Sequence, residues 1–367
     1  MIEDILNKNQ LEKEDLLKLM LIDNREDLDK LFKKAYEIKL KHRGNKVFYR
    51  GLIECSNICI KNCKYCGIRK DNKKVERFSL TKEDIIESAK LIYKNGYASM
   101  AIQAGERIDK EHINFIGDII KRIQNLSELD MGITLSLGEQ NYETYKKWFN
   151  AGASRYLLRI ETTNKELFKK IHYDDNLHSY EKRLKALKDL KKAGYQVGSG
   201  VMIGIPGQTP EDLVNDILFF KEIDLDMIGM GPYILHEDTP MGKEFKNDII
   251  SEERRLELSL KMIAICRIFL KDINIAATTA LQVLDEKGRE KGIKAGANVI
   301  MPNTTKIEAR KNYNLYDGKP GVKDNSKEVK YSLEKNLKEM GEEVGYFQKG
   351  DSPHYFERLQ KKLNKKS

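Results

Sequence analysis

Three cysteines stand within eight residues, at Cys59, Cys63 and Cys66, and supply three thiolates from one short segment. Thiolates are the usual protein ligands of a [4Fe–4S] cluster. Because three sulfurs bind only three of the four irons, the fourth iron stays open to a reactant, as the open position does in a catalytic zinc site. The spacing C-x3-C-x2-C therefore predicts a [4Fe–4S] cluster that takes part in chemistry.

Cys55 lies four residues upstream and offers a different interpretation, a closed zinc site with four thiolates. Zinc ligands usually come as two short pairs separated by a longer stretch, not as four cysteines in twelve residues. Cys55 also ends 48–55, a mostly apolar run typical of a strand, in which a cysteine packs as a small side chain. The spacing favours the cluster over a zinc-containing nucleic-acid binder.

The composition indicates a globular chain in a reducing compartment. Five cysteines, an odd number with four of them bunched, argue against a disulfide framework. No apolar run approaches the ~18 residues of a membrane span, and the first residues mix acids and bases, unlike a signal peptide. The net charge of +9 is spread among nearly as many acids, which is typical of solvated helix faces. We expect a cytoplasmic protein without a membrane or nucleic-acid partner.

Short apolar runs alternate with amphipathic stretches from residue 47 onward, the pattern of βα units around a parallel sheet. Eight such units in about 255 residues predict an α/β fold, a (βα)8 TIM-type barrel. We expect an N-terminal helical extension over 1–46, the barrel over 47–303, and a C-terminal extension over 304–367 that closes the barrel and ends in helices. The predicted strands are 47–54, 98–103, 131–137, 154–160, 196–203, 226–231, 273–278 and 296–301.

Polar residues follow most of these strands, at the ends where barrel enzymes place their active sites. The cysteine segment follows the first strand directly. Arg159 and Glu161 carry opposite charges at alternate positions, so they share a face, and a buried charge needs a partner or a ligand. The other polar positions include Gln103, Gly105, Glu106, Ser136, Glu139, Gln208, Thr278 and Thr279.

The cysteine segment, with Tyr65 before its last cysteine, resembles the C-x3-C-x-aromatic-C loop of the radical S-adenosylmethionine (SAM) superfamily, in which SAM chelates the open iron. The residues at the strand ends identify a family more specifically than the cysteine motif, which the whole superfamily shares. They resemble the HydE family, radical SAM maturases that help to build the active-site cluster of [FeFe]-hydrogenase, whereas biotin synthase and methylornithine synthase match less well. The stretches that carry the resemblance are 54–57, 63–67, 134–139, 156–162, 205–209, 277–280 and 296–303.

The resemblance implies a role for each matching residue. Cys59, Cys63 and Cys66 ligate one [4Fe–4S] cluster; no cysteine follows Cys266, a core residue by its apolar surroundings, so a second cluster near the C-terminus is not expected. Arg159, Thr278 and Thr279 form an anion site for the carboxylate of a cysteine-derived substrate, a task that suits a guanidinium fork and hydroxyl donors. Tyr313 and Tyr316 close the cavity, and Met227 lies on its wall.

The resemblance also implies which residues contact SAM. Tyr65 lies along the adenine, the element 103–106 meets the methionine amino group, and Glu161 and Arg183 hold the ribose and the carboxylate. The residues expected to contact this cofactor are Tyr65, Gln103, Gly105, Glu106, Ser136, Glu161, Arg183 and, on the wall, Met227.

The resemblance implies an enzyme that cleaves SAM to methionine and a 5′-deoxyadenosyl radical in hydrogenase maturation. Its substrate would be a cysteine-bound iron–carbonyl–cyanide complex, and its partners an electron donor and, transiently, other hydrogenase maturases. Two alternatives stay open besides the zinc protein. One is a radical SAM enzyme for a small organic substrate, similar to methylornithine synthase or biotin synthase. The other is an inactive paralogue that keeps only the fold, against which the intact cysteines argue.

Overall fold

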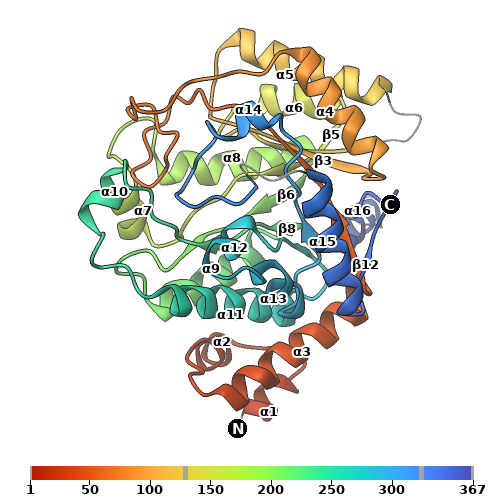
Figure 1. Ribbon diagram of the computed structural model, residues 1–367. Coiled ribbons are helices and arrows are strands. Elements are labelled where there is room, and N and C mark those ends of the chain that lie inside the picture. The colour runs from red at the N-terminus through yellow and green to blue at the C-terminus, as the bar shows by residue number, and fades with distance from the viewer. Residues whose placement is uncertain (1, 127–130, 322–325, 365–367) are drawn as a thin grey trace.

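A ring of parallel strands surrounded by helices forms the centre of the computed structural model, which describes residues 2–126, 131–321 and 326–364 (Figure 1). Seven strands form one parallel sheet in the order β10–β8–β6–β5–β4–β3–β2. Their bounds are β2 Gly51–Ser56, β3 Ser99–Ala104, β4 Gly132–Ser136, β5 Ala153–Leu157, β6 Gln196–Ser199, β8 Met227–Ile228 and β10 Asn274–Ile275.

The strand β11 (Val299–Ile300) closes the ring between the two edges of this sheet. On one side, the amide of Ala277 donates to Val299 O at 2.9 Å. On the other side, β11 pairs in parallel with β1 (Lys46–Tyr49), which continues after one residue into β2. The predicted (βα)8 barrel is therefore confirmed. Two predicted strands are interrupted, because β7 (Met202–Ile203) and β9 (Gly231–Pro232) form a separate pair at the carboxyl ends of β6 and β8.

The helices between the strands begin where the sequence places capping residues. Thr81 accepts a hydrogen bond from the amide of Asp84, whose carboxylate accepts one in return, and this capping box starts α4 (Lys82–Lys94). Thr209 starts α9 (Pro210–Glu222) in the same way. The other helices between β3 and β11 are α5 Lys110–Leu126, α6 Tyr142–Asn150, α7 Lys165–Ile171, α8 Tyr180–Ala193, α10 Pro240–Glu244, α11 Glu252–Leu270, α12 Thr279–Leu284 and α13 Gly288–Lys294.

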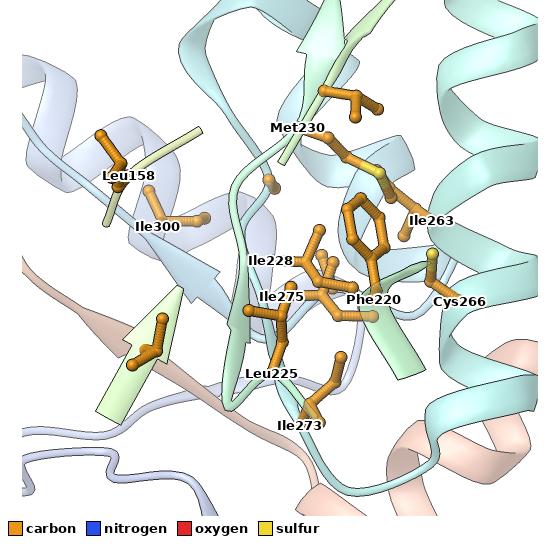
Figure 2. Packing of buried hydrophobic residues seen from close by; sticks show 14 of the residues in the cluster. Leu158, Phe220, Leu225, Ile228, Met230, Ile263, Cys266, Ile273, Ile275 and Ile300 are labelled. Atoms are coloured by element: carbon orange, nitrogen blue, oxygen red, sulfur yellow. The ribbon is translucent and has the colours of Figure 1, made fainter. Parts of the chain in front are cut away.

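The hydrophobic core lies between the barrel wall and these helices. Figure 2 shows Phe220 of α9 and Cys266 of α11 facing Ile228 of β8 and Ile275 of β10. Cys266 is fully buried in this layer, and burial raises the pKa of its thiol well above the ordinary value. The expectation that Cys266 is a core residue is confirmed.

The N-terminal helices lie together against one side of the barrel (Figure 1). They are α1 (Ile2–Leu6), α2 (Lys13–Met20) and α3 (Arg25–Arg43). Lys39 of α3 makes a fully buried ion pair with Glu342, which joins this extension to the C-terminal part of the chain. None of the described helices combines the length and the apolar character needed to cross a membrane.

The C-terminal extension contains α14 (Ile307–Arg310), α15 (Ser326–Glu339), β12 (Glu343–Val344), which pairs with β1, and α16 (Pro353–Asn364).

Between β12 and α16, residues 349–352 form a floor segment under the amino ends of the barrel strands. Asp351 accepts hydrogen bonds from Arg155 of β5 and Gln196 of β6, both at 2.7 Å. The first carbonyl of the segment accepts from Ser99 Oγ of β3 at 2.7 Å. The floor segment thereby fills the end of the barrel opposite the cysteines.

Candidate active site

One cavity of about 240 Å³ lies at the carboxyl ends of the barrel strands. It brings together thirteen of the sixteen residues that the sequence predicts for the site. They are Cys59, Cys63, Tyr65, Cys66, Gln103, Gly105, Glu106, Ser136, Arg159, Glu161, Arg183, Tyr313 and Tyr316.

The cluster loop, residues 57–69, is held against the end of β3 by backbone contacts. Cys59 Sγ accepts hydrogen bonds from the amides of Lys61 and Glu106, at 3.4 and 3.3 Å. The amide of Ile60 donates to Glu106 O at 2.9 Å. Gly105 is needed for this approach, because a Cβ atom there would lie 2.4 Å from Ile58 O. These contacts fix the first cysteine at the edge of the cavity.

The three thiols of the loop are available to an iron–sulfur cluster, because Cys59, Cys63 and Cys66 all line the cavity. Burial raises the pKa of Cys63 to about 12, and it raises those of Cys59 and Cys66 too. Such thiols stay protonated at neutral pH unless a metal takes the place of the proton.

Cys55 does not complete a zinc site. It lies within β2, only 1% exposed, and it does not line the cavity. Burial raises the pKa of its thiol to about 12. The structure therefore favours the interpretation of Cys55 as a packed side chain.

An ion cluster of four side chains lies at one wall of the cavity, and three of them, Lys61, Glu106 and Arg183, line it. Lys61 Nζ lies 3.1 Å from Glu139 Oε2 and 3.4 Å from Glu106 Oε1, and Arg183 Nε pairs with the other oxygen of Glu139. Burial raises the pKa of Glu106 to about 7. At Glu139 the effect of burial is outweighed by Arg183 and Lys61, which hold the pKa of this carboxyl below its usual range. Glu139 is therefore bound to two cations, whereas Glu106 shares only one.

Arg159 and Glu161 follow β5 and share a face, as their alternate spacing predicts, and they form an ion pair with each other. Arg159 Nη2 lies 3.0 Å from Glu161 Oε2 and donates to Val201 O at 2.8 Å. Glu161 has a φ of 70°, a left-handed conformation that is uncommon outside glycine and is held by backbone hydrogen bonds to Gly200 and Met202.

The same pair leaves a polar atom without a partner at the cavity that it lines. Arg159 Nε is buried and makes no hydrogen bond with any described residue, whereas Glu161 Oε2 is partnered only by the Arg159 guanidinium. Unsatisfied buried polar groups cost free energy, so this site is built to gain a polar ligand.

Three predicted residues do not line the cavity. Thr278 Oγ1 donates to Met230 O at 3.1 Å, and Thr279 begins α12, although the next residue, Ala280, does line the cavity. Met227 is the first residue of β8, at the amino end of the barrel, and its Sδ lies 3.0 Å from Arg50 Nη1. Met227 is therefore below the cavity and not on its wall, because the site lies at the opposite end of the strand.

Comparisons with known proteins agree with this geometry. The radical SAM superfamily profile matches residues 53–220. The [FeFe] hydrogenase maturase subunit HydE of Thermotoga maritima is 45% identical to this chain over 315 residues, which cover 86% of each protein. The chain belongs to the HydE family.

More distant proteins are similar to this chain in sequence or in fold. The 3-methylornithine synthase of Methanosarcina acetivorans is 28% identical over 93% of this chain and 92% of that protein. Among solved structures, methylornithine synthase (PylB) covers 94% of this chain and 97% of its own, with a TM-score of 0.78 and 23% identity. The maturase HydG covers 98% of this chain and 79% of its own, with a TM-score of 0.80 and 22% identity.

As a member of the HydE family and the radical SAM superfamily, the chain uses a [4Fe–4S] cluster and SAM. The residues of the cavity fit both groups. Cys59, Cys63 and Cys66 line it and offer three sulfur ligands, and Arg159 Nε, which has no hydrogen-bond partner among the described residues, is free to donate to a polar ligand.

Sequence reasoning missed the residues that hold the roof of the HydE cavity. The cap segment, residues 311–319, carries Tyr313 and Tyr316 over the cavity. Lys319 Nζ anchors it, 2.5 Å from Glu54 Oε1 and 2.7 Å from Tyr313 O. The amide of Gly67 donates to the cap at Leu315 O, at 2.9 Å. No local pattern links Lys319 to Glu54, because 265 positions separate them.

Proposed function

We propose that this chain is a HydE-type maturase that acts on a cysteine-bound iron–carbonyl–cyanide complex during assembly of the [FeFe]-hydrogenase active site. The proposal rests on one observation above all: thirteen residues predicted for the site line a single cavity. The 45% identity to a curated HydE supports the same activity.

In this proposal Cys59, Cys63 and Cys66 hold the cluster at the edge of the cavity. The cluster, when reduced, supplies the electron that cleaves SAM to methionine and a 5′-deoxyadenosyl radical. The surrounding side chains then position SAM. Tyr65 lies along the adenine, and Glu106, which shares a single cation with Glu139, accepts the ammonium of the methionine moiety.

Arg183 and Glu161 complete the SAM site. Arg183 is held in place by Glu139 and donates to Arg159 O at 2.6 Å, so its guanidinium is fixed before SAM binds. Preorganised charge of this kind lowers the cost of binding an ionic ligand. We assign the SAM carboxylate to Arg183 and the ribose hydroxyls to Glu161, with Gln103, Gly105 and Ser136 along the remaining wall.

We assign the substrate carboxylate to Arg159, whose Nε has no other hydrogen-bond acceptor among the described residues. A guanidinium binds a carboxylate through charge-assisted hydrogen bonds. Thr279 stays predicted as a hydroxyl donor beside it, next to Ala280 of the cavity lining, whereas the hydroxyl of Thr278 donates to Met230 O. Tyr313 and Tyr316 roof the cavity and exclude water, which protects a radical from side reactions.

An anaerobic maturation assay tests this function. The protein, reconstituted with iron and sulfide, is the only source of HydE activity, with the other maturases supplied, and the Cys63→Ala variant is the control. Hydrogenase activity that depends on SAM and is absent in the control is the expected result. SAM cleavage without hydrogenase activity would overturn the proposed substrate and favour a small organic one, as in methylornithine synthase, which product analysis by mass spectrometry would identify.

A further inference from the structure

The connection between α7 and α8 contacts the cluster loop between its cysteines. The amide of Lys64 donates to Ile171 O at 3.0 Å, and Lys61 Nζ donates to Leu177 O. These contacts define a clamp segment, residues 171–179. The clamp segment holds the middle of the loop, whereas the end of β3 holds the first cysteine.

His178 makes a third contact, through a side chain that is fully buried. Its Nε2 accepts a hydrogen bond from the amide of Asn62 at 3.0 Å. Because an amide N–H can only donate, the ring proton of His178 lies on Nδ1, which donates to Asp175 Oδ1 at 2.7 Å. Burial lowers the pKa of this imidazole, so the ring is neutral at pH 7 and Nε2 stays an acceptor. One ring therefore ties the residue before Cys63 to the clamp segment.

His178 also stands at the start of α8, the helix that carries Arg183. Ser179 follows His178 directly and is the N-cap of α8, and the amide of Arg183 donates to Ser179 O at 3.1 Å. The side chain of Arg183 is buried and is itself held by Glu139. His178 therefore connects two parts of the site, the loop that carries Cys63 and the helix that carries Arg183.

The clamp segment also contacts Tyr65, the residue assigned to the adenine. The ring of His172 meets that of Tyr65 edge-on, with the centroids 5.6 Å apart, and its centroid lies 5.5 Å from that of His178. His172 is buried, and its Nδ1 lies 3.0 Å from Phe168 O within α7. Edge-to-face contacts of this kind favour one orientation of an aromatic side chain. The clamp segment thus supports a second residue of the SAM site.

We propose that His178 is a positioning residue that sets the register between the cluster loop and the group that binds the SAM carboxylate. The inference rests on the proposed function, in which Arg183 binds that carboxylate. SAM chelates the open iron in the radical SAM superfamily, so its affinity depends on the spacing between Arg183 and the cluster ligands. His178 does not line the cavity. It acts through Asn62 and Ser179, and by fixing the spacing in advance it lowers the cost of ordering the site when SAM binds.

Two substitutions of His178 separate this role from simple packing. The amide oxygen of Gln reaches the position of Nε2 and can accept from the amide of Asn62, whereas the shorter Asn reaches only the position of Nδ1. SAM binding to the reconstituted protein is measured by titration calorimetry and by the change that SAM causes in the electron paramagnetic resonance spectrum of the reduced cluster.

The two variants should differ in their affinity for SAM. In His178→Asn we expect the Kd for SAM to rise roughly 3- to 10-fold, the value of a net hydrogen bond, and the spectral change to require correspondingly more SAM. His178→Gln should stay within about twofold of the wild-type Kd, because the acceptor is restored. Both variants should keep the wild-type iron content, since the three cysteines are unchanged.

His112→Asn is the matched control, because it removes a similarly buried imidazole from α5. This variant should keep the wild-type affinity for SAM. An unchanged affinity in His178→Asn, an equal loss in His178→Gln or in His112→Asn, or loss of iron from His178→Asn would overturn the inference. SAM binding is measured without substrate, so failure of the proposed function would appear separately, as a protein that binds SAM normally but does not mature hydrogenase.

Discussion

Lys319 Nζ lies 2.5 Å from Glu54 Oε1, and this ion pair joins the roof of the cavity to the barrel strand that leads into the cluster loop. Both side chains are less than 10% exposed. Asn303 Nδ2 donates to the second carboxylate oxygen of Glu54 at 3.0 Å, so the pair is fully hydrogen-bonded. The roof and the cluster loop are therefore positioned by the same carboxylate.

The Lys319→Met variant should lose stability, because it leaves the carboxylate of Glu54 buried without a cation. Removal of one partner from a buried ion pair costs about 3–5 kcal/mol. Urea unfolding followed by circular dichroism measures the change. The double variant Lys319→Met/Glu54→Gln should recover much of the loss, and an equal loss in the single and double variants would show that packing, not charge, dominates there.

Replacement of Cys63 and replacement of Cys55 should have different effects on the cluster. Cys63→Ala should remove the brown chromophore and SAM cleavage together, because two thiolates cannot retain the cluster in its reactive form. Cys55→Ala, a change inside β2, should leave both nearly intact. Absorption spectra and iron content of the reconstituted variants measure this. Loss of iron in Cys55→Ala would show that the ligand assignment is wrong.

Replacement of Arg159 should impair product formation much more than SAM cleavage. Arg159→Ala removes the proposed anchor of the substrate carboxylate but keeps the cluster ligands, so uncoupled SAM cleavage should persist while product formation falls roughly 10- to 100-fold, the value of a charge-assisted hydrogen bond. Arg159→Lys should recover little, because an ammonium lacks the planar fork. Quantification of 5′-deoxyadenosine against matured hydrogenase measures the ratio. A parallel fall in both would place Arg159 in the SAM site instead.

The free energy of unfolding should decrease in mildly alkaline solution, because His354 of α16 loses its proton there. Its Nε2 lies 2.6 Å from Asp224 and its Nδ1 3.3 Å from Asp272, and these carboxylates raise its pKa from 6.5 to about 9. Because the folded pKa is above the unfolded one, the stabilisation is complete below about pH 6.5 and is lost as the pH rises through 9. Allowing for solvent screening, the loss is roughly 1–2 kcal/mol.

The unfolding free energy at pH 6 and at pH 9.5 checks this prediction. His354→Asn should remove most of the difference between the two values, since asparagine does not titrate. A pH dependence that persists unchanged in the variant would assign the effect to other groups.

The sequence predicted the features that depend on neighbouring residues. The βα alternation located the strands, and the spacing of Arg159 and Glu161 placed two charges together on one face, where they form an ion pair. The cysteine spacing and the strand-end positions brought thirteen residues to one cavity. Met227 was misplaced although its strand was predicted, because a residue at the start of a barrel strand lies at the end opposite the site.

Contacts between distant segments left no signal in the sequence. Lys61 resembles any surface lysine of a basic loop, yet it is buried between Glu106 and Glu139, which follow two different strands. Lys319 lies in a polar stretch with no regular periodicity, and its partner Glu54 lies in a strand that otherwise reads as apolar. Such pairs depend on the closed barrel, and only the complete fold shows them.

The barrel cannot be completed before the floor segment has been synthesised. Arg155 of β5 and Gln196 of β6 find their partner in Asp351, almost at the end of the chain, and Ser99 of β3 finds its own in the same segment. Until residues 349–352 have been synthesised and have folded into place, these polar groups lack their partners. A chain that stops short of the floor segment therefore leaves the buried guanidinium of Arg155 without its carboxylate.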